Sequence, residues 1–555
     1  MTNVYLRNGV LLAILGATAV SPAFANGNFA PDKLADEPAE VPNPNPRSPG
    51  ITAPTLLSPD LRQSAVAEGS FRLENPEPGF EFYGFNSDGP HVPAPGAMPS
   101  ASGPIEATKT EPDKNTYLVL HNLHGADSSV DYGTHFLFQG HENSVSGKGY
   151  ITRINLDADG EHRVSLIATT DTNGAALPTI DGSTWDPFAR RLLYTAEGNG
   201  STTGGVWQST PDVPGVVNDL SGIFGRGGYE GVQTDSAGNI WIVEDIGGST
   251  VGGARVANSF VFRFIPKNRW DLTAGGKLQA LQVQKLDHSG PIVFNGANAL
   301  TQDLKDLHSY GNVFDTTWVT VHDTDVDGTT VFNANALAKA RNATPFKRPE
   351  NGQFRPGTQF REFYFDETGD TSATTTGADH GGFGGVLKLW QSHPSANAGK
   401  LNLVFKGDVE HTAFDNVAFW DANHVVFLED RGDGLHGQAN AFDSAWMLDV
   451  RQNYASAAHQ PKRILAQGRD ALATADSQFL GLTGFQNDGD NELTGIHVSD
   501  GDPGFSGLLG VKVPHLFSGG WRAFYTQQHG ENITWEILPA TNREDDHGHD
   551  GNIGW

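Results

Sequence analysis

Pairs of acidic residues recur in this chain at a fixed spacing. Glu230 and Glu244 are fourteen residues apart, and so are Asp415 and Glu429. Between the two acids of each pair lie a short apolar segment, a turn and a second apolar segment, which is the pattern of a β-hairpin. The acids of each pair are therefore expected at the same end of a hairpin, where a carboxylate is a good ligand for a hard cation.

Two further segments repeat this hairpin pattern less closely. One runs from Asp181 to Glu197 with a longer turn, and the other begins at Glu492 and closes, after a long insertion, near Gln527. Repeated hairpins with carboxylates at the same end are typical of a β-propeller, whose central mouth gathers one end of every blade. The sequence therefore predicts an all-β fold, a β-propeller with long insertions between its blades.

The composition limits the kind of metal site that this chain can build. Its 67 Gly and 31 Pro residues punctuate many short segments, and it has no Cys. A chain without Cys has no disulfide, no thiolate ligand and no Cys nucleophile. Any bound metal must therefore be held by oxygen or imidazole.

The chain is strongly acidic, with a formal net charge of −28. Nucleic acids and anionic membrane surfaces are bound by basic patches, and none stands out in this sequence, so both are disfavoured as partners. Multivalent cations are favoured instead. The alternative for the bulk of the charge is that acidity keeps an exported protein soluble.

Four regions are expected along the chain. Residues 1–25 match a secretory signal peptide, which predicts export to the periplasm or the medium; no long apolar run follows, so no membrane insertion is expected after cleavage. Residues 26–112 are rich in Pro and predict extended chain that wraps the domain or leads into it. The propeller is expected over residues 113–540. Residues 541–555 form an acidic tail in which His547 and His549 could sequester metal, although a disordered solubilising tail is favoured.

Two segments outside the repeated pairs could bind cations. Glu142 follows an apolar strand and could be a ligand for a hard cation, or it could be a solvated loop acid. Asp323, Asp325 and Asp327 alternate before a Gly, as in a calcium loop, but the acid that an EF-hand needs at the twelfth position is missing. A plain acidic turn is the alternative there.

A third segment presents an arginine and a glutamate on a stiff backbone. Arg348 and Glu350 lie next to Pro349, and Pro345 precedes them, so the backbone around both side chains is restricted. An arginine can fork onto phosphate or carboxylate oxygens, and a glutamate can bind a cation. Equally, the two residues could form a structural ion pair.

Several short motifs resemble the PhoX family of secreted bacterial alkaline phosphatases. The resemblance runs from about Glu77 to Trp535. It implies a six-bladed propeller with a cluster of calcium and iron in its central mouth, which hydrolyses phosphomonoesters. The motifs are Glu230-Gly-Val232, Asn258 to Phe264, Arg348-Pro-Glu350, Leu428-Glu-Asp-Arg-Gly-Asp-Gly434 and Gln527 to Glu531.

The resemblance also implies which residues bind the metal. In the family, an iron ligand is a Cys just before an acidic residue, and Ala196 stands at that position here. Calcium is therefore the expected metal, and iron could be bound only without a sulfur ligand. Acidic residues occupy the segment from Asp488 to Gly495, where the family has a phosphate-binding Arg. The implied metal ligands are Glu142, Glu197, Glu230, Glu350 and Glu492, with Glu244, Asp415, Glu429 and Asp430 as further candidates.

The function expected from these residues is that of an exported, metal-dependent phosphatase that acts on small phosphomonoesters. A calcium-rich centre would polarise the phosphoryl group, with Arg348 or Arg431 holding its negative charge. One alternative is a non-catalytic, calcium-stabilised propeller that binds a ligand or partner through its loops. Another is a different hydrolase, such as a lactonase, on the same scaffold.

Overall fold

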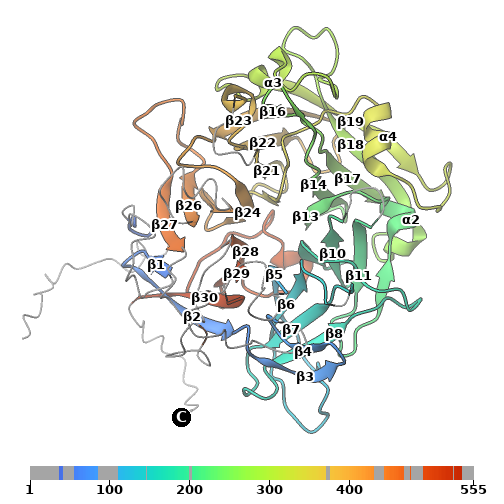
Figure 1. The fold of residues 1–555 in the computed structure, drawn as a ribbon, viewed down its shortest axis with the longest axis vertical. Coiled ribbons are helices and arrows are strands. Elements are labelled where there is room, and N and C mark those ends of the chain that lie inside the picture. Colours follow the sequence, from blue (N-terminus) through green and yellow to red (C-terminus); the bar gives the residue numbers. More distant parts are fainter. Residues whose placement is uncertain are drawn as a thin grey trace, which may run out of the picture.

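The structure is a computed structural model, and nearly all of its regular elements are β-strands (Figure 1). It describes residues 37–41, 55–85, 110–145, 147–198, 203–370, 376–430, 443–467, 476, 492–528 and 531–540. Among these residues, no helix is long and apolar enough to cross a membrane. The predicted all-β propeller fold is confirmed.

Within the described residues, six antiparallel blades of four strands each surround a common axis (Figure 1). Blade 1 contains β5 (Pro112–Val119), β6 (His135–His141), β7 (Ile151–Asn155) and β8 (Val164–Ala168), and blade 2 contains β9 (Ser183–Asp186), β10 (Arg191–Ala196), β11 (Gly205–Ser209) and β12 (Val217–Asp219). Blade 3 contains β13 (Tyr229–Thr234), β14 (Ile240–Glu244), β17 (Val261–Pro266) and β18 (Gly276–Val283). Blade 4 contains β20 (Gly352–Phe354), β21 (Glu362–Glu367), β22 (Gly385–Gln391) and β23 (Ala398–Lys406).

The last two blades recruit strands from the beginning of the chain. Blade 5 contains β24 (Phe414–Phe419), β25 (His424–Glu429), β26 (Asp443–Asp449) and β27 (Lys462–Gln467), with β1 (Thr55–Leu57) added at its outer edge. Blade 6 contains β28 (Glu492–Ser499), β29 (Arg522–Gln528), β30 (Ile533–Pro539) and, as its outermost strand, β2 (Leu61–Ala67). In Figure 1, the blue β2 lies beside the red β30.

Pairing of β2 with β30 closes the ring of blades. It covers the outer edge of the last blade with a strand from the other end of the sequence, which leaves fewer unpaired backbone groups at that edge. The innermost strands of neighbouring blades are also in contact around the axis, and β28 contacts β5. The segment before residue 112, which was predicted to wrap the domain or lead into it, therefore supplies strands to blades 5 and 6.

The remaining elements lie between or outside the blades. The strand β19 (Phe314–Asp323) pairs with both β18 and β23 and so joins the outer edges of blades 3 and 4. Two small hairpins are formed by β3 (Arg72–Glu77) with β4 (Phe80–Phe82), and by β15 (Thr250–Val251) with β16 (Ala254–Arg255). The helices are short: α2 (Ser221–Phe224), α3 (Gln302–Leu307), α4 (Ala334–Ala340), and the 3-10 turns η1 (Leu272–Ala274), η2 (Ala378–His380) and η3 (Phe505–Gly507).

The two hairpins with the fourteen-residue spacing are present as predicted. In blade 3, Tyr229 on β13 pairs with Glu244 on β14, and in blade 5, Phe414 pairs with Glu429 in the same way. The register then shifts on the inner strand of each hairpin, directly after the paired residue. Such an irregularity redirects a side chain. The acid that follows the paired residue, Glu230 or Asp415, lies in this irregular stretch.

Aromatic side chains fill the space between the blades. Trp241 is buried between blades 3 and 4, with ring centroids 5.2 Å from Trp318 and 5.0 Å from Phe363. Beside it, the buried guanidinium of Arg263 lies 4.5 Å from the ring centroid of Trp318 and donates a hydrogen bond to the carbonyl of Pro394. This apolar packing fixes the blades against one another and so fixes the ends of their inner strands.

Candidate metal centre

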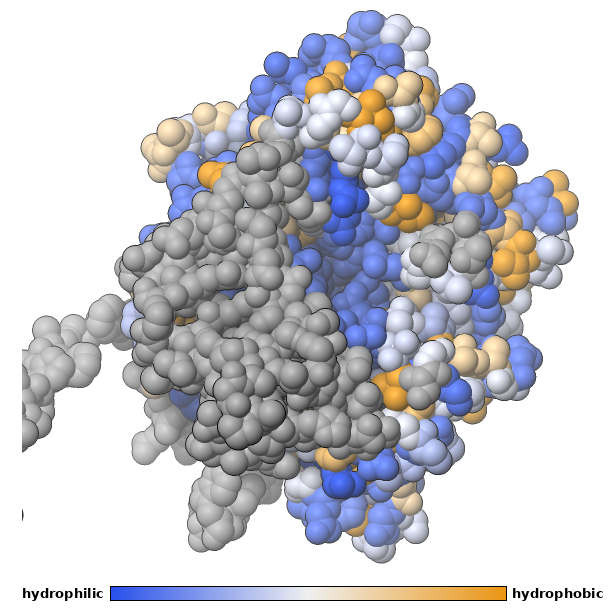
Figure 2. All heavy atoms as spheres, viewed as in Figure 1, coloured by the Kyte–Doolittle hydropathy of each residue, from blue (hydrophilic) through white to orange (hydrophobic). Residues whose placement is uncertain are grey.

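One end of the axis, which we call the mouth, collects acidic side chains from most of the blades. At this end the innermost strand of a blade begins and its second strand ends. In blades 3 and 5, for example, β13 and β24 begin there, and β14 and β25 end there. Figure 2 shows hydrophilic residues lining a hollow near the centre of the molecule. The acids of the repeated hairpins therefore do come together at one place.

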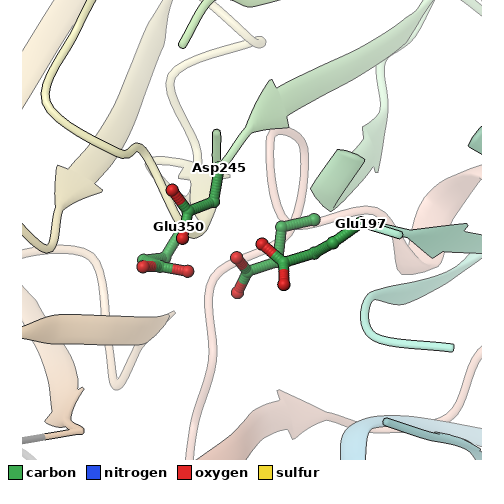
Figure 3. Close-up of side chains that lie close together, drawn as sticks. Glu197, Asp245 and Glu350 are labelled. Atoms are coloured by element: carbon green, nitrogen blue, oxygen red, sulfur yellow. The ribbon is translucent and has the colours of Figure 1, made fainter. Parts of the chain in front are cut away.

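The first acidic group consists of Glu197, Glu230, Asp245 and Glu350. One carboxylate oxygen from each lies within 4.8 Å of the oxygens of the others. Glu197 directly follows β10, Glu230 lies in β13, Asp245 directly follows β14, and Glu350 precedes β20. Figure 3 shows the carboxyl groups of Glu197, Asp245 and Glu350 close together, although they come from three different blades.

The second acidic group consists of Asp113, Glu142 and Asp181, whose carboxylate oxygens meet the same 4.8 Å limit. Asp113 lies in β5, Glu142 directly follows β6, and Asp181 precedes β9. The side-chain amide of Gln528 donates a hydrogen bond of 2.6 Å to Glu142. Blades 1 and 2 thus supply this group, and blade 6 supports it.

Further acids belong to the same mouth. Asp415 lies in β24, Asp430 follows β25, and Glu492 begins β28. Burial raises the pKa of Glu492 well above its ordinary value, and the negative charges of Asp430, Glu142 and Asp415 raise it further, so these three carboxyl groups lie within electrostatic reach of Glu492. Three predicted ligands from blades 5 and 6 therefore lie near the two groups, although neither group includes them.

The carboxyl groups of the mouth resist ionisation when no cation is present. Burial raises the pKa of Glu197, Glu230 and Glu350 well above the ordinary value, and neighbouring negative charges raise it further. Burial followed by the charge of Asp113 raises the pKa of Asp415 to about 8. Such crowding is unfavourable unless protons or cations compensate for it.

Several of these carboxylates have an oxygen that no other group satisfies. Among the described residues, the buried oxygens Asp181 Oδ1, Glu230 Oε2 and Asp415 Oδ2 have no hydrogen-bond partner. A buried polar atom without a partner is costly, and its presence points to a ligand. Since the donors are carboxylate oxygens and the chain has no Cys, the residues fit hard cations such as Ca²⁺.

Two basic side chains reach the mouth in the described part of the chain. The Nε atom of Arg348 donates to both oxygens of Asp245, at 2.8 and 2.9 Å, and its Nη2 atom lies 3.3 Å from Glu350. Lys114, the residue after Asp113, donates a hydrogen bond of 3.0 Å to the side-chain oxygen of Asn416. Arg348 therefore forms the ion pair that the sequence allowed, and Arg431 lies outside the described residues.

Glu244 and Glu429 are held in a different way from the other predicted ligands. The carboxylate of Glu244 accepts hydrogen bonds from the backbone N–H of Phe260, at 3.1 Å, and from the side chain of Asn335, at 2.8 Å. The carboxylate of Glu429 accepts from the backbone N–H groups of Thr412 and Ser444, at 3.2 and 3.0 Å. Both residues link the end of a second strand to neighbouring backbone, and neither belongs to the two acidic groups.

The sequence analysis did not identify Asp113, Asp181 and Asp245 as ligands. The strand pairing does give a signal for Asp113. Pro112 pairs with His141 in blade 1 as Tyr229 pairs with Glu244 in blade 3, so Asp113 corresponds to Glu230. Asp245 is next to the predicted ligand Glu244 in the chain. Its place beside Glu230 depends on how β13 and β14 are arranged in the folded protein. The pattern of alternating acids at Asp323 and Asp325 forms a turn whose carboxylates pair with Lys277 and Lys267.

Comparison with known proteins agrees with this fold. Residues 253–499 match the family model described as alkaline phosphatase PhoX. The structure resembles Pseudomonas fluorescens PhoX in complex with vanadate, a transition state analogue, with 11% sequence identity, a TM-score of 0.52, and coverage of 89% of this chain and 98% of that chain. No curated protein matches the sequence.

Two other solved structures are less similar. The WD40 domain of Toxoplasma gondii coronin has 8% identity and a TM-score of 0.31 over 91% of each chain. The PQQ-bound aldose sugar dehydrogenase of Streptomyces coelicolor has 10% identity and a TM-score of 0.27 over 74% of this chain and 99% of that chain. The fold and its acidic mouth thus define a β-propeller with a candidate metal centre. The predicted resemblance to the PhoX family of alkaline phosphatases is confirmed.

Proposed function

We propose that this protein is an exported, metal-dependent phosphatase that hydrolyses phosphomonoesters at a calcium centre in the mouth. The observation that carries the proposal is the convergence of the two acidic groups, with buried carboxylate oxygens that have no partner among the described residues. The match to the PhoX family supports an alkaline phosphatase-like activity. The signal-like residues 1–25 support export.

The two acidic groups would hold the cations. The first group would provide a site between blades 2, 3 and 4, and the second group a site between blades 1 and 2. Bound calcium would supply the positive charge that polarises a phosphoryl oxygen and offsets charge in the transition state. The chain's own contribution is to hold its carboxylates in place on strand ends that the packed blades make rigid.

Arg348 remains the candidate for contacting the phosphoryl group. Its side chain is 22% exposed, while that of Asp245, to which it is hydrogen-bonded, is 4% exposed. The buried aspartate would therefore orient the guanidinium and leave part of it facing the mouth. A planar guanidinium in a fixed orientation is suited to binding oxygen atoms of a phosphate.

Calcium without iron is the metal content that we propose. At the end of β10 the chain places Ala196, a buried residue without a metal-binding group, directly before Glu197. The described donors in both acidic groups are carboxylates, and hard oxygen donors favour Ca²⁺ over softer metals. Elemental analysis of the purified protein is the direct measurement.

One observation favours the non-catalytic alternative. The guanidinium of Arg348 already binds Asp245 at 2.8 and 2.9 Å and lies near Glu350, so phosphate has to compete with two carboxylates. A propeller whose calcium ions serve stability alone would show the same acidic groups without turnover. A lactonase-like hydrolase would show turnover, but of another ester.

The test compares two glutamate variants for hydrolysis of p-nitrophenyl phosphate in calcium-containing buffer. Glu230→Gln removes a charge from the first acidic group, and we expect a loss of activity of at least ~100-fold together with lower bound calcium. Glu362→Gln is the matched control, because Glu362 pairs with Arg355 at 3.0 Å at the far end of blade 4. Wild-type protein that binds calcium but hydrolyses no phosphomonoester would refute the phosphatase and leave the binding propeller.

A further inference from the structure

Lys114 is a buried lysine that lies among acids rather than beside a single partner. Its side chain is 4% exposed, and its ammonium group donates to Asn416, whose amide in turn donates a hydrogen bond of 2.7 Å to Asp415. The backbone N–H of Gly495 holds the same Asn416 oxygen at 2.9 Å. Blades 1, 5 and 6 therefore fix the position of the ammonium group.

Burial lowers the pKa of the Lys114 ammonium group, and carboxyl groups from four blades raise it again in part, so these groups lie within electrostatic reach of Lys114. These groups are Asp113 in blade 1, Glu230 in blade 3, Asp366 in blade 4 and Asp415 in blade 5. Two of them, Glu230 and Asp415, have a buried oxygen without a hydrogen-bond partner among the described residues. An ammonium group at this place attracts the same carboxylates that a bound cation would attract.

We propose that Lys114 serves as a built-in cation of the metal centre, which compensates part of its negative charge and so lowers the amount of calcium that the fold needs. This inference rests on the proposed calcium centre. It makes Lys114 a positioning residue that keeps the carboxylates of blades 1, 3, 4 and 5 close together. It does not require Lys114 to contact the substrate.

A second lysine provides the contrast. Lys347 is also buried, at 1% exposure, but its ammonium group forms an ion pair of 2.7 Å with Asp370, donates to the backbone carbonyl of Arg255 and lies outside both acidic groups. If Lys114 were merely a buried polar residue, replacing it should have the same kind of effect as replacing Lys347. If the Lys114 ammonium group takes over part of the role of a bound cation, the loss of stability in its variant should depend on calcium.

The experiment measures the melting temperature of the full-length mature protein with saturating calcium and with EDTA. Lys114→Met keeps the length of the side chain and removes its charge, so we expect the difference between the two melting temperatures to widen by about 5 °C relative to wild type. Lys347→Met should lower both melting temperatures and leave their difference unchanged. The number of calcium ions bound, measured by elemental analysis, should not fall in Lys114→Met.

The outcomes separate this inference from the proposed centre. A wild-type protein whose melting temperature is the same in calcium and EDTA would refute the calcium centre, and this inference with it. A wild type that responds to calcium, together with a Lys114→Met variant that responds equally, would refute the role of Lys114 alone. Failure of Lys114→Met to fold in saturating calcium would also refute it, because calcium should replace the lost charge.

A charge-compensated variant gives an independent check. In Lys114→Met with Asp415→Asn, one positive and one negative charge are lost together, and we expect the calcium dependence to return toward that of wild type. If the double variant depends on calcium as strongly as Lys114→Met, the ammonium group does not act through these carboxylates, and the inference is wrong.

Discussion

Glu244 offers a sharp test of how the buried acids of the blades affect stability. Burial raises the pKa of Glu244 from 4.5 to about 8, and the hydrogen bonds from Asn335 and Phe260 lower it only in part. A group whose pKa is higher in the folded state binds its proton more tightly there. Its contribution to stability is therefore greatest at low pH and is lost as the pH rises from about 4.5 to about 8.

The magnitude follows from the size of this shift. A rise from 4.5 to about 8 corresponds to about 5 kcal/mol of stability lost above pH 8. Glu244→Gln removes the titration while keeping a carbonyl oxygen that can accept from Phe260 and Asn335. The new amide group would replace Oε1, which is buried and has no hydrogen-bond partner among the described residues, and this costs about 1–3 kcal/mol at every pH.

The assay is thermal unfolding of wild type and Glu244→Gln at pH 5 and at pH 8, each with calcium and with EDTA. We expect the melting temperature of the variant, relative to wild type, to rise between pH 5 and pH 8. Glu161→Gln, which alters an exposed glutamate, is the control and should show no such change. A difference that stays constant with pH would refute the reasoning.

Calcium distinguishes the two possible roles of Glu244. Hydrogen bonds to Phe260 and Asn335 place this carboxylate outside the two acidic groups, so the variant should keep its response to calcium. If Glu244→Gln instead loses the stabilisation that calcium gives to wild type, Glu244 is a metal ligand, as the repeated spacing first predicted.

Two further predictions concern the scaffold. Arg263→Met should lower the free energy of unfolding, measured by urea denaturation, by about 3 kcal/mol, because the carbonyl groups of Pro394 and Ala396 lose a charged donor. Gln282→Met is the control, because the Gln282 side chain donates to a backbone carbonyl nearer the surface. An equal loss of stability in the control would contradict this prediction. Deletion of residues 26–67 should abolish cooperative unfolding, followed by circular dichroism, because β30 loses its partner β2; a mature protein that still melts cooperatively at the wild-type temperature would contradict the closure of the ring.

Local sequence patterns were enough to predict several hairpins of the propeller. The hairpin of Glu230 and Glu244 follows from the alternation of apolar segments with a turn between them, and these features depend on neighbouring residues. The absence of Cys similarly limits the metal donors to oxygen and imidazole, whatever the fold. The sequence predicted residues 26–112 as extended chain around or before the domain, but not that β1 and β2 join blades 5 and 6, because their partners lie hundreds of residues away.

The sequence by itself determined the hairpins, the end of each hairpin that carries acids, and the chemistry of the available ligands. The tertiary structure decided which acids meet. Glu244 and Asp245 are neighbours in the chain, yet only Asp245 joins Glu197 and Glu230, while Glu244 binds the backbone of the next strand. Successive side chains of an extended strand point to opposite sides, so the packing of the blades around the axis selects the one that faces the mouth.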